Sequence, residues 1–482
     1  MMRRELQIVL LMIGWGQALD CPPALDKSLT LFDLHPYEFE WHRGKMATGS
    51  IPLGFTDPQP QNRECREEIT FPNRPLLTWD DSTSVISFLP ILGQEMRLDS
   101  ETVSASEAGV ILSGGKGLVS FSLDTRTYME VGGNSDRPSF DHQIVDSQDG
   151  DVTGALDYRS YSRFQGDLNL TLPFGNLSVA RNSAHWGPGL FENLTFSEEA
   201  IPFYQYLFTS DIGPLHVASL YGDLLIGENQ SYSSENREQR SLYAHRYELT
   251  LGTDWLMGVT EQLVLYEMGK PYLFAPIFPL FIAKGFLYEG NTNGNLAVDL
   301  TWRSPWSTLL YGEFLLDDLE SPSSLFLHDY IQNKWGVMAG FHWAHLGEKW
   351  STGIIGEFSY IRPWVYAHFQ PRTAQFSNLG QPLGNPSGPD SRNGTIKVYG
   401  RKGESWYAGC KFGVRWKGKG PGSDEEQPVP ETPLESQESL LGAKAEFFGE
   451  PEVVWKSRVA TLFLSARLSE SSSARLGVRV FR

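Results

Sequence analysis

The sequence has few cysteines, no excess of positive charge and, beyond its first residues, no long apolar run. Three cysteines in 482 residues are too few for a disulfide framework. Cys21 and Cys65 could pair in an oxidising compartment, whereas Cys410 has no obvious partner. The formal net charge of -18 argues against nucleic acid as a partner, because phosphate groups require a basic surface.

The lack of a long apolar run argues against a membrane-spanning helix, which needs about 18 or more apolar residues. The N-terminus nevertheless has the pattern of a secretory signal. Arg3 and Arg4 precede a short apolar run at 8–15, and the small residues of Gly16-Gln17-Ala18 follow it. We therefore predict a signal peptide at residues 1–18, with a short buried helix as the alternative. A membrane location would have to be reached as a β-barrel.

Sequence motifs for metals and cofactors are also missing. No Cys/His spacing suits zinc, and no glycine-rich phosphate loop lies between a strand and a helix. Asp317 and Asp318 are neighbours, and neighbouring residues of a strand point to opposite faces, so solvated carboxylates are a better interpretation than a Ca²⁺ site. We expect no metal and no cofactor.

The sequence does contain alternating apolar and polar residues, which is the period of a β-strand. The clearest case is Trp406–Lys417, where even positions are apolar with a tryptophan at each end, and odd positions include Lys411, Arg415 and Lys417. About ten residue steps of ~3.3 Å, tilted by about 40–45°, span roughly the 25 Å apolar band of a transmembrane barrel. The charged face cannot lie unpaired in a dry core, so it fits a wet lumen.

The same alternation begins near Leu118 and recurs around residues 296–303, 459–468 and 474–482. We predict an all-β fold, an antiparallel transmembrane β-barrel over residues 116–482 with roughly 16–20 strands. A soluble sandwich or propeller also alternates, but the secretory signal, the aromatic brackets and the lack of a repeat of about 20 to 50 residues favour the barrel.

Other parts of the chain do not alternate clearly. Residues 19–115 read as an irregular periplasmic region or plug, with short helices possible around Gln94–Ala108. Two long connections, Arg362–Lys402 and Lys419–Leu440, are expected at the outer side of the barrel, where long loops lie. If the strand around it is unbroken, Glu313 shares a lumenal face with Leu315 and Asp317.

The most distinctive stretch is Ala180–Phe203, which has the form of a strand end followed by His185-Trp186-Gly187-Pro188-Gly189. Glycines on both sides of a proline allow a sharp turn and positive φ. Because Trp186 lies between a strand and this turn, we predict that it lies at a rim and not in a core.

This stretch resembles the capsule assembly Wzi family of bacterial outer-membrane proteins, in which a W-G-P-G run is followed by L-x-L-S-x-x-A-x-P-F. The matching residues are Trp186, Gly187, Pro188, Gly189, Leu194, Phe196, Ser197, Ala200, Pro202 and Phe203. Phe196 stands where the family more often has Leu. Similar blocks follow in the same order at residues 211–215, 311–318, 334–336 and 380–384. After the last block the family tends to read G-H-P-x-G-P-D, and residues 385–390 lack the histidine.

The resemblance implies a non-enzymatic protein of the bacterial outer membrane that binds polysaccharide in capsule assembly and surface attachment. The expected partners are then a capsular or other surface polysaccharide and outer-membrane lipid. An aromatic face can stack on a sugar ring, but aromatic residues also collect as girdles at both membrane interfaces. The candidate polysaccharide-binding residues are His185, Trp186, Trp364, Tyr366, His368 and Tyr399.

Two other functions remain open from the sequence. A porin-like channel would share the barrel and its polar lumen. A barrel hydrolase would need a nucleophile and a base, and Ser183-Ala184-His185 has the reverse of the order found in outer-membrane phospholipases. We therefore expect no catalytic residues.

Overall fold

The computed structural model describes residues 43, 45–48, 77–81, 84–98, 102–132, 146–148, 158–197, 200–226, 239–266, 269–284, 292–318, 333–347, 349–369, 374–403, 405–424, 428–430, 438–457, 460–469 and 473–481. The signal peptide predicted at residues 1–18, and the pairing suggested for Cys21 and Cys65, lie outside these residues. Cys410 has a free thiol.

Nearly all of the described secondary structure is β-strand. The strands are β1 (Leu77–Asp81), β2 (Ser84–Leu98), β3 (Thr102–Lys116), β4 (Val119–Val131), β5 (Asp146–Gln148), β6 (Tyr158–Leu172), β7 (Gly175–Asn182), β8 (Phe203–Ile212), β9 (Leu215–Leu225), β10 (Gln239–Leu251), β11 (Trp255–Leu265), β12 (Thr292–Ser304), β13 (Thr308–Asp318), β14 (Lys334–Leu346), β15 (Trp350–Ile361), β16 (Ser377–Asn378), β17 (Gln381–Pro382), β18 (Ser391–Lys402), β19 (Trp406–Lys417), β20 (Lys444–Lys456), β21 (Ala460–Arg467) and β22 (Ser473–Phe481). Two short helical segments, η2 (Pro271–Phe274) and α3 (Leu280–Lys284), lie between β11 and β12.

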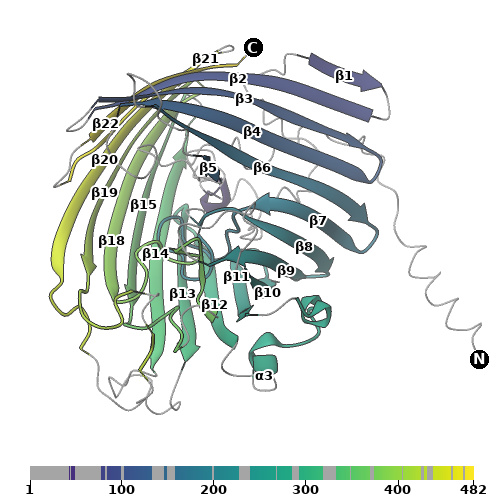
Figure 1. Ribbon diagram of the computed structural model, residues 1–482, viewed down its shortest axis with the longest axis vertical. Coiled ribbons are helices and arrows are strands. Elements are labelled where there is room, and N and C mark those ends of the chain that lie inside the picture. Colours follow the sequence, from purple (N-terminus) through teal and green to yellow (C-terminus); the bar gives the residue numbers. More distant parts are fainter. Residues whose placement is uncertain are drawn as a thin grey trace, which may run out of the picture.

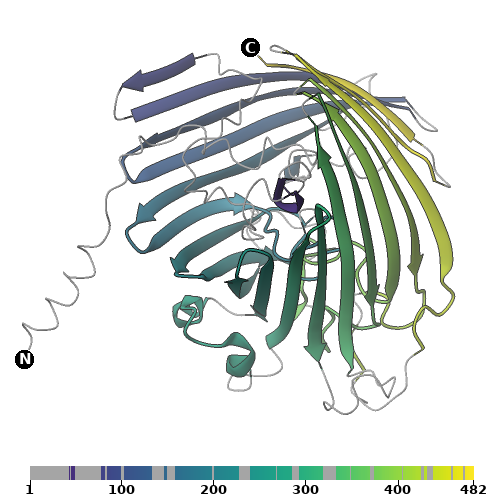
Figure 2. The ribbon, with the colours of Figure 1, turned by 180° about the vertical axis from the view of Figure 1, so that it is seen from behind.

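The strands form a closed antiparallel barrel. Each long strand pairs with its neighbours in the chain, and the last strand, β22, pairs with β2, where Ile91 lies opposite Phe481. Among the described residues, 18 strands make up the closed wall, and the short strands β1 and β5 pair at its edges with β2 and β6. Figures 1 and 2 show the blue N-terminal strands beside the yellow C-terminal strands, where the barrel closes. The predicted transmembrane β-barrel is confirmed.

The faces of the strands follow the predicted alternation. On β19, Trp406 and Phe412 are 49% and 54% exposed on the outer face, whereas Tyr407 is buried and Lys417 reaches inward to the carbonyl of Ser387.

The same division holds on other strands. On β4 the buried face is polar. On β12, Val298 and Leu300 face outward and Asp299 and Thr301 are buried. Apolar side chains therefore face the membrane and charged ones the interior, the reverse of a soluble protein.

Two predictions about the strands are wrong. The stretch expected to be irregular, with short helices around Gln94–Ala108, forms the paired strands β2 and β3 of the wall, so the barrel begins well before residue 116. Small residues such as Ala105 and Gly109 give little contrast between the two faces of β3. This strand is defined instead by its pairing with β4. The connection predicted at Arg362–Lys402 ends at residue 390, because β18 occupies residues 391–402.

The two ends of the barrel differ in the length of their connections. The turns after β6, β8, β10, β12, β14 and β18 have two or three residues, whereas the connections after β7, β9, β11, β13, β15 and β19 are long. Short turns face the periplasm and long loops face outside in outer-membrane barrels. We therefore assign the end with long connections to the cell exterior. No helix in the described part of the chain is long and apolar enough to cross a membrane.

Candidate functional site

Two long connections from the exterior end fold into the barrel and not away from it. We call residues 183–197 and 200–202, between β7 and β8, the first inner segment, and residues 362–369 and 374–390, between β15 and β18, the second inner segment. Both contribute side chains to one buried apolar cluster that also contains inward-facing wall residues. Members of this cluster include Trp186, Leu194, Phe196, Val365, Tyr366, Phe376, Leu383, Leu242, Leu315 and Met338.

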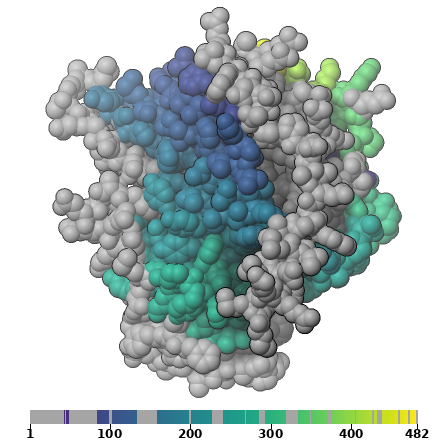
Figure 3. All heavy atoms as spheres, turned by 90° about the vertical axis from the view of Figure 1, so that its right-hand side faces the viewer, coloured from purple at the N-terminus to yellow at the C-terminus, as the bar shows by residue number. Residues whose placement is uncertain are grey.

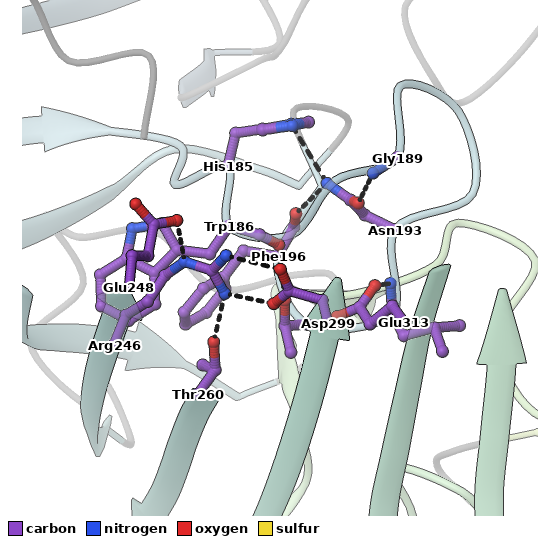
Figure 4. Close-up of polar contacts among 12 residues, drawn as sticks. His185, Trp186, Gly189, Asn193, Phe196, Arg246, Glu248, Thr260, Asp299 and Glu313 are labelled. Carbon is purple, nitrogen blue, oxygen red and sulfur yellow. Dashed lines mark hydrogen bonds and ion pairs between the residues drawn. The ribbon is translucent and has the colours of Figure 1, made fainter. Parts of the chain in front are cut away.

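The first inner segment is a compact turn closed by one asparagine. Gly187 has a φ of 116°, the positive value expected of a glycine beside this proline. The Asn193 side chain accepts a hydrogen bond from the Gly189 amide at 2.6 Å and donates one to the Phe196 carbonyl at 3.2 Å. The rings of Trp186 and Phe196 pack edge to face with centroids 5.3 Å apart (Figure 4). The W-G-P-G motif therefore builds a buried turn.

Carboxylates of the wall hold this turn by its backbone. Glu357 of β15 accepts hydrogen bonds from three consecutive amides, those of Leu190, Phe191 and Glu192, at 2.6, 2.8 and 3.0 Å. The Tyr311 hydroxyl donates a fourth bond to Glu357 at 2.6 Å. Glu357 is 4% exposed. Buried carboxylates are stable only when such donors replace water, so the segment and the wall each require the other.

Glu313 on β13 holds the same segment from another strand of the wall. Its carboxylate accepts a hydrogen bond from the Leu194 amide at 2.8 Å. Glu313, Leu315 and Asp317 are all buried on the inner face, so the lumenal face predicted for these three residues is confirmed. The wall thus presents its acidic groups where the inner segments present backbone donors.

A further buried carboxylate comes from the first inner segment itself. Glu192 accepts hydrogen bonds from Ser359 and Asn393 of the wall at 2.8 and 2.9 Å. It also accepts one from Asn385 of the second inner segment at 2.9 Å, and one from Thr395 at 3.1 Å. These four donors are all neutral side chains. Glu192 therefore connects both inner segments to β15 and β18.

The second inner segment is held in an unusual backbone conformation. Trp364 and Tyr366 have φ values of 68° and 70°, in the left-handed region that residues with a Cβ seldom adopt. The Tyr366 amide donates a hydrogen bond to Asp317 at 2.7 Å, which holds this conformation against the wall. Farther along, Arg240 of β10 donates to the carbonyl of Ser377 at 2.7 Å.

The two inner segments pack directly on each other. The Tyr366 hydroxyl donates a hydrogen bond to the Leu194 carbonyl at 2.7 Å, and the Ser197 amide donates to the Leu383 carbonyl at 2.9 Å. Gly384 lies so close that an added Cβ would collide with the Leu194 carbonyl oxygen. The backbones can approach this closely only because residue 384 is glycine.

His185 is buried within the first inner segment. Asn193 donates a hydrogen bond to its ring nitrogen Nε2 at 3.1 Å, which requires a neutral ring. Burial, together with the cations Arg43 and Arg246, lowers the pKa of His185 to about 3. His185 is therefore a neutral structural residue near pH 7.

A buried ion network lies on the wall below the first inner segment. Arg246 of β10 pairs with Glu248 at 2.6 Å and with Asp299 of β12 at 2.8 Å, and donates to Thr260 at 2.7 Å. Figure 4 shows these groups converging from neighbouring strands beneath His185 and Trp186. Both carboxylates lie against the one guanidinium, so each charged group of this network has an opposite partner within the wall.

The candidate polysaccharide-binding residues do not lie where the sequence suggested. His185, Trp186, Trp364, Tyr366, His368 and Tyr399 are only 1% to 6% exposed. The predicted rim position of Trp186 is wrong, because the chain after the Gly-Pro-Gly turn folds inward and buries the ring. Trp186 and Tyr366 share the apolar cluster, whereas Trp364 packs with Ala367 in another.

The remaining two candidates have partners of their own. Tyr399 is on the wall strand β18, and its hydroxyl lies 2.8 Å from a ring nitrogen of His342. The ring of His368 packs on Phe369 with centroids 4.2 Å apart. Sequence reasoning missed Glu192, Glu357 and Asn393. The position of Glu357 and Asn393 on the inward faces of β15 and β18 is a signal that could have marked these two, whereas Glu192 lies in the first inner segment, where no alternation marks it.

Arg43 and Ala47, which precede β1 in the chain, also contact the inner segments. The Arg43 guanidinium donates a hydrogen bond to the Pro188 carbonyl and lies 4.6 Å from the centroid of the Tyr311 ring. Ala47, in the same short helical stretch, is 1% exposed within the apolar cluster. Arg43 and Ala47 therefore pack against the inner segments and the wall.

The wall from β18 to β21 keeps part-exposed charges on its inner face. Lys411 pairs with Glu450 at 2.6 Å, and these side chains are 25% and 29% exposed. Glu452 is 31% exposed and pairs at 2.8 Å with the buried Lys397. The described residues contain no cluster of three or more His, Cys, Asp or Glu side chains placed to hold a metal ion.

No protein-family model matches the sequence, and a search of curated proteins finds no match either. Among solved structures the chain is similar to Wzi, described as an outer membrane protein involved in group 1 capsule assembly in Escherichia coli and a carbohydrate-binding β-barrel. That alignment has a TM-score of 0.51 and 13% identity over 80% of this chain and 83% of that one.

Two further structures also align. They are OpdK of Pseudomonas aeruginosa, with a TM-score of 0.43 and 11% identity over 82% of this chain and 98% of that one, and OccAB2 of Acinetobacter baumannii, with a TM-score of 0.46 and 9% identity over the same shares. At 13% identity the likeness to Wzi shows the fold alone. The chain is a β-barrel of the bacterial outer membrane.

Proposed function

We propose that this chain is a non-enzymatic barrel that binds a surface polysaccharide and attaches it to the cell in capsule assembly. The observation that carries the proposal is the packing of the two inner segments inside the barrel. A general diffusion channel requires an open bore, whereas here apolar side chains and buried carboxylates fix two connections across it. Such a rigid floor is suited to presenting a binding surface at the exterior end.

The sequence motifs support the same proposal. The W-G-P-G run and its continuation, which resemble the capsule assembly family, form the first inner segment, and the block at residues 380–384 lies in the second. The solved structure described as a carbohydrate-binding barrel shares the fold. The residues of the resemblance therefore converge on one region of the molecule.

The six candidate residues enter this proposal as supports of the binding surface. Their rings are enclosed by protein atoms, so they offer no free face on which a sugar could stack. Trp186 and Tyr366 hold the two inner segments together, and Tyr399 anchors the wall beside them. A substitution in this group should therefore weaken polysaccharide binding through displacement of the segments.

The test is to measure cell-bound and free polysaccharide in a strain that lacks the protein and in strains that carry Trp186→Ala or wild type. We expect polymer to be released from the surface in the first two strains while its export continues. Barrel abundance in the membrane is the control. Unchanged cell-bound polymer in the deletion strain would refute the attachment function.

A porin-like channel is the second candidate, because one observation favours it. The pair Lys411–Glu450 and the carboxylate of Glu452 keep partly exposed charges on the inner face of β19 and β20, where a polar path could remain beside the inner segments. Conductance in planar bilayers separates the two functions. Polysaccharide binding predicts little or no steady conductance, and large regular steps would favour the channel.

A further inference from the structure

A set of polar side chains lies on the outer face of the barrel, where lipid is expected. On β10, Arg246 and Glu248 point inward, so the alternating residues Tyr243, His245 and Tyr247 point outward. Glu261 of β11 is outward by the same argument, because Thr260 and Gln262 on either side of it bond to inner groups. Despite this position, Tyr243 and His245 are 1% and 0% exposed.

These residues lie within the height of the apolar band. Trp255 and Trp302 stack near the short-turn end with centroids 5.4 Å apart. Glu261 lies six residues farther along β11 than Trp255, opposite His245 of β10. Six steps of ~3.3 Å on a strand tilted by about 40–45° correspond to ~15 Å of height, less than the ~25 Å of the band. Water cannot satisfy polar groups there.

The connection between β11 and β12 satisfies these groups by folding back along the outer wall. We call its residues 270–284, which include η2 and α3, the outer flap. His245 donates to the Leu273 carbonyl at 3.0 Å, Tyr247 donates to the Pro276 carbonyl at 2.6 Å, and Glu261 accepts from the Leu280 amide at 3.0 Å. Ser219 of β9 donates to the Phe274 carbonyl. Leu273 and Leu280 pack beneath the flap against Tyr243, Leu263 and Leu265.

The outward side of the flap is apolar. Its exposed side chains are Tyr272 at 52%, Ile277 at 78%, Phe278 at 45%, Phe281 at 39% and Ile282 at 60%. Figure 1 shows α3 beside the ends of β10 and β11, and Figure 3 shows the green spheres of this region on the outer surface below the blue strands. The surface continues that of the neighbouring wall, where Val298 and Leu300 are 42% and 43% exposed.

We propose that the outer flap is a membrane-seated second layer of the barrel, whose apolar side chains insert among the acyl chains of the outer leaflet. The flap replaces a polar stretch of the wall by an apolar one and supplies hydrogen-bond partners to the covered side chains. Its occupant is lipid because its exposed face is continuous with the lipid-facing wall and lies at the height of the apolar band. A second copy of the chain covering this face in place of lipid would contradict the proposal.

The experiment places single spin labels in a chain in which Cys21, Cys65 and Cys410 are replaced by serine. The label sites are Ile277→Cys and Ile282→Cys, both exposed, so the labels displace no packed side chain. Leu300→Cys is the lipid-facing control, and Lys411→Cys is the control for a polar inner surface. Collision rates with oxygen and with a water-soluble nickel chelate are measured in lipid bilayers.

We expect both flap labels to match the Leu300 control, with frequent oxygen collisions and at least fivefold fewer nickel collisions than at Lys411. Nickel collisions at both flap labels as frequent as at Lys411 would place the flap in water and overturn the proposal. Dipolar broadening that grows with the fraction of labelled chains would show that a second copy covers the flap, and would overturn it as well.

Discussion

Replacing Glu357 by glutamine should release the first inner segment while leaving the barrel closed. The carboxylate accepts four hydrogen bonds, three from consecutive amides and one from Tyr311. The glutamine oxygen can retain two of them, and the new NH₂ group faces the other two donors. Two buried donors without a partner cost about 1–3 kcal/mol each, which gives about 2–6 kcal/mol for Glu357→Gln.

Hydrogen exchange provides the assay, because the affected amides are known. At constant pH, exchange at Leu190, Phe191 and Glu192 should accelerate by at least about 30-fold, the equivalent of about 2 kcal/mol, while strand amides keep their protection. The matched control is Glu450→Gln, which removes a wall carboxylate that pairs with Lys411 and Arg467 of the neighbouring strands. Wild-type exchange in Glu357→Gln would refute the view that this carboxylate holds the segment.

Three further predictions concern the same core. Gly384→Ala should separate the inner segments, because the new Cβ meets the Leu194 carbonyl, and protease should then cut near residue 384; a resistant variant would contradict the close packing. Trp186→Ala should destabilise the first inner segment by about 3–5 kcal/mol, as for other buried aromatic residues. If hydrogen exchange shows that the segment loses less than about 1 kcal/mol of local stability, Trp186 would lie at a rim and not in the core. The folded pKa of His185 is lowered, so its stabilising contribution is present above the unfolded pKa near 6.5 and is lost as pH falls toward about 3; at pH 5 the loss is about 2 kcal/mol. Thermolysin cleavage of the segment should therefore rise between pH 7.5 and pH 5 in wild type more than in His185→Gln, and equal rises would contradict this linkage.

The barrel could be predicted from the sequence because the physics of its wall is local. On β19, apolar residues between two tryptophans and charged residues on the other face define both the strand and its register. In β2 and β3 the same rule fails, since Gly93, Ala105 and Gly109 offer too little contrast between the faces. Those strands are specified by pairing between neighbours, which a single sequence does not display.

The folding of the two inner segments into the barrel could not be predicted, although the sequence shows the polar residues that hold them there. Inward polarity at Glu313 and Glu357 indicates a need for hydrogen-bond donors but does not distinguish water from a folded-back connection. The sequence predicts the sharp Gly-Pro-Gly turn after Trp186, but the inward direction of the turn depends on the acceptors Glu313 and Glu357, more than a hundred residues later. On the outer face, the polar Glu261 among lipid-facing residues is the corresponding signal for the flap.

The most direct test of the central claim is a glycan array of bacterial surface polysaccharides probed with the detergent-folded wild-type barrel. We expect saturable binding to at least one acidic or neutral capsular polymer, and weaker binding of Glu357→Gln to the same polymer. Absence of binding to every polymer, by a barrel that is folded and heat-modifiable on gels, would contradict polysaccharide binding as its function.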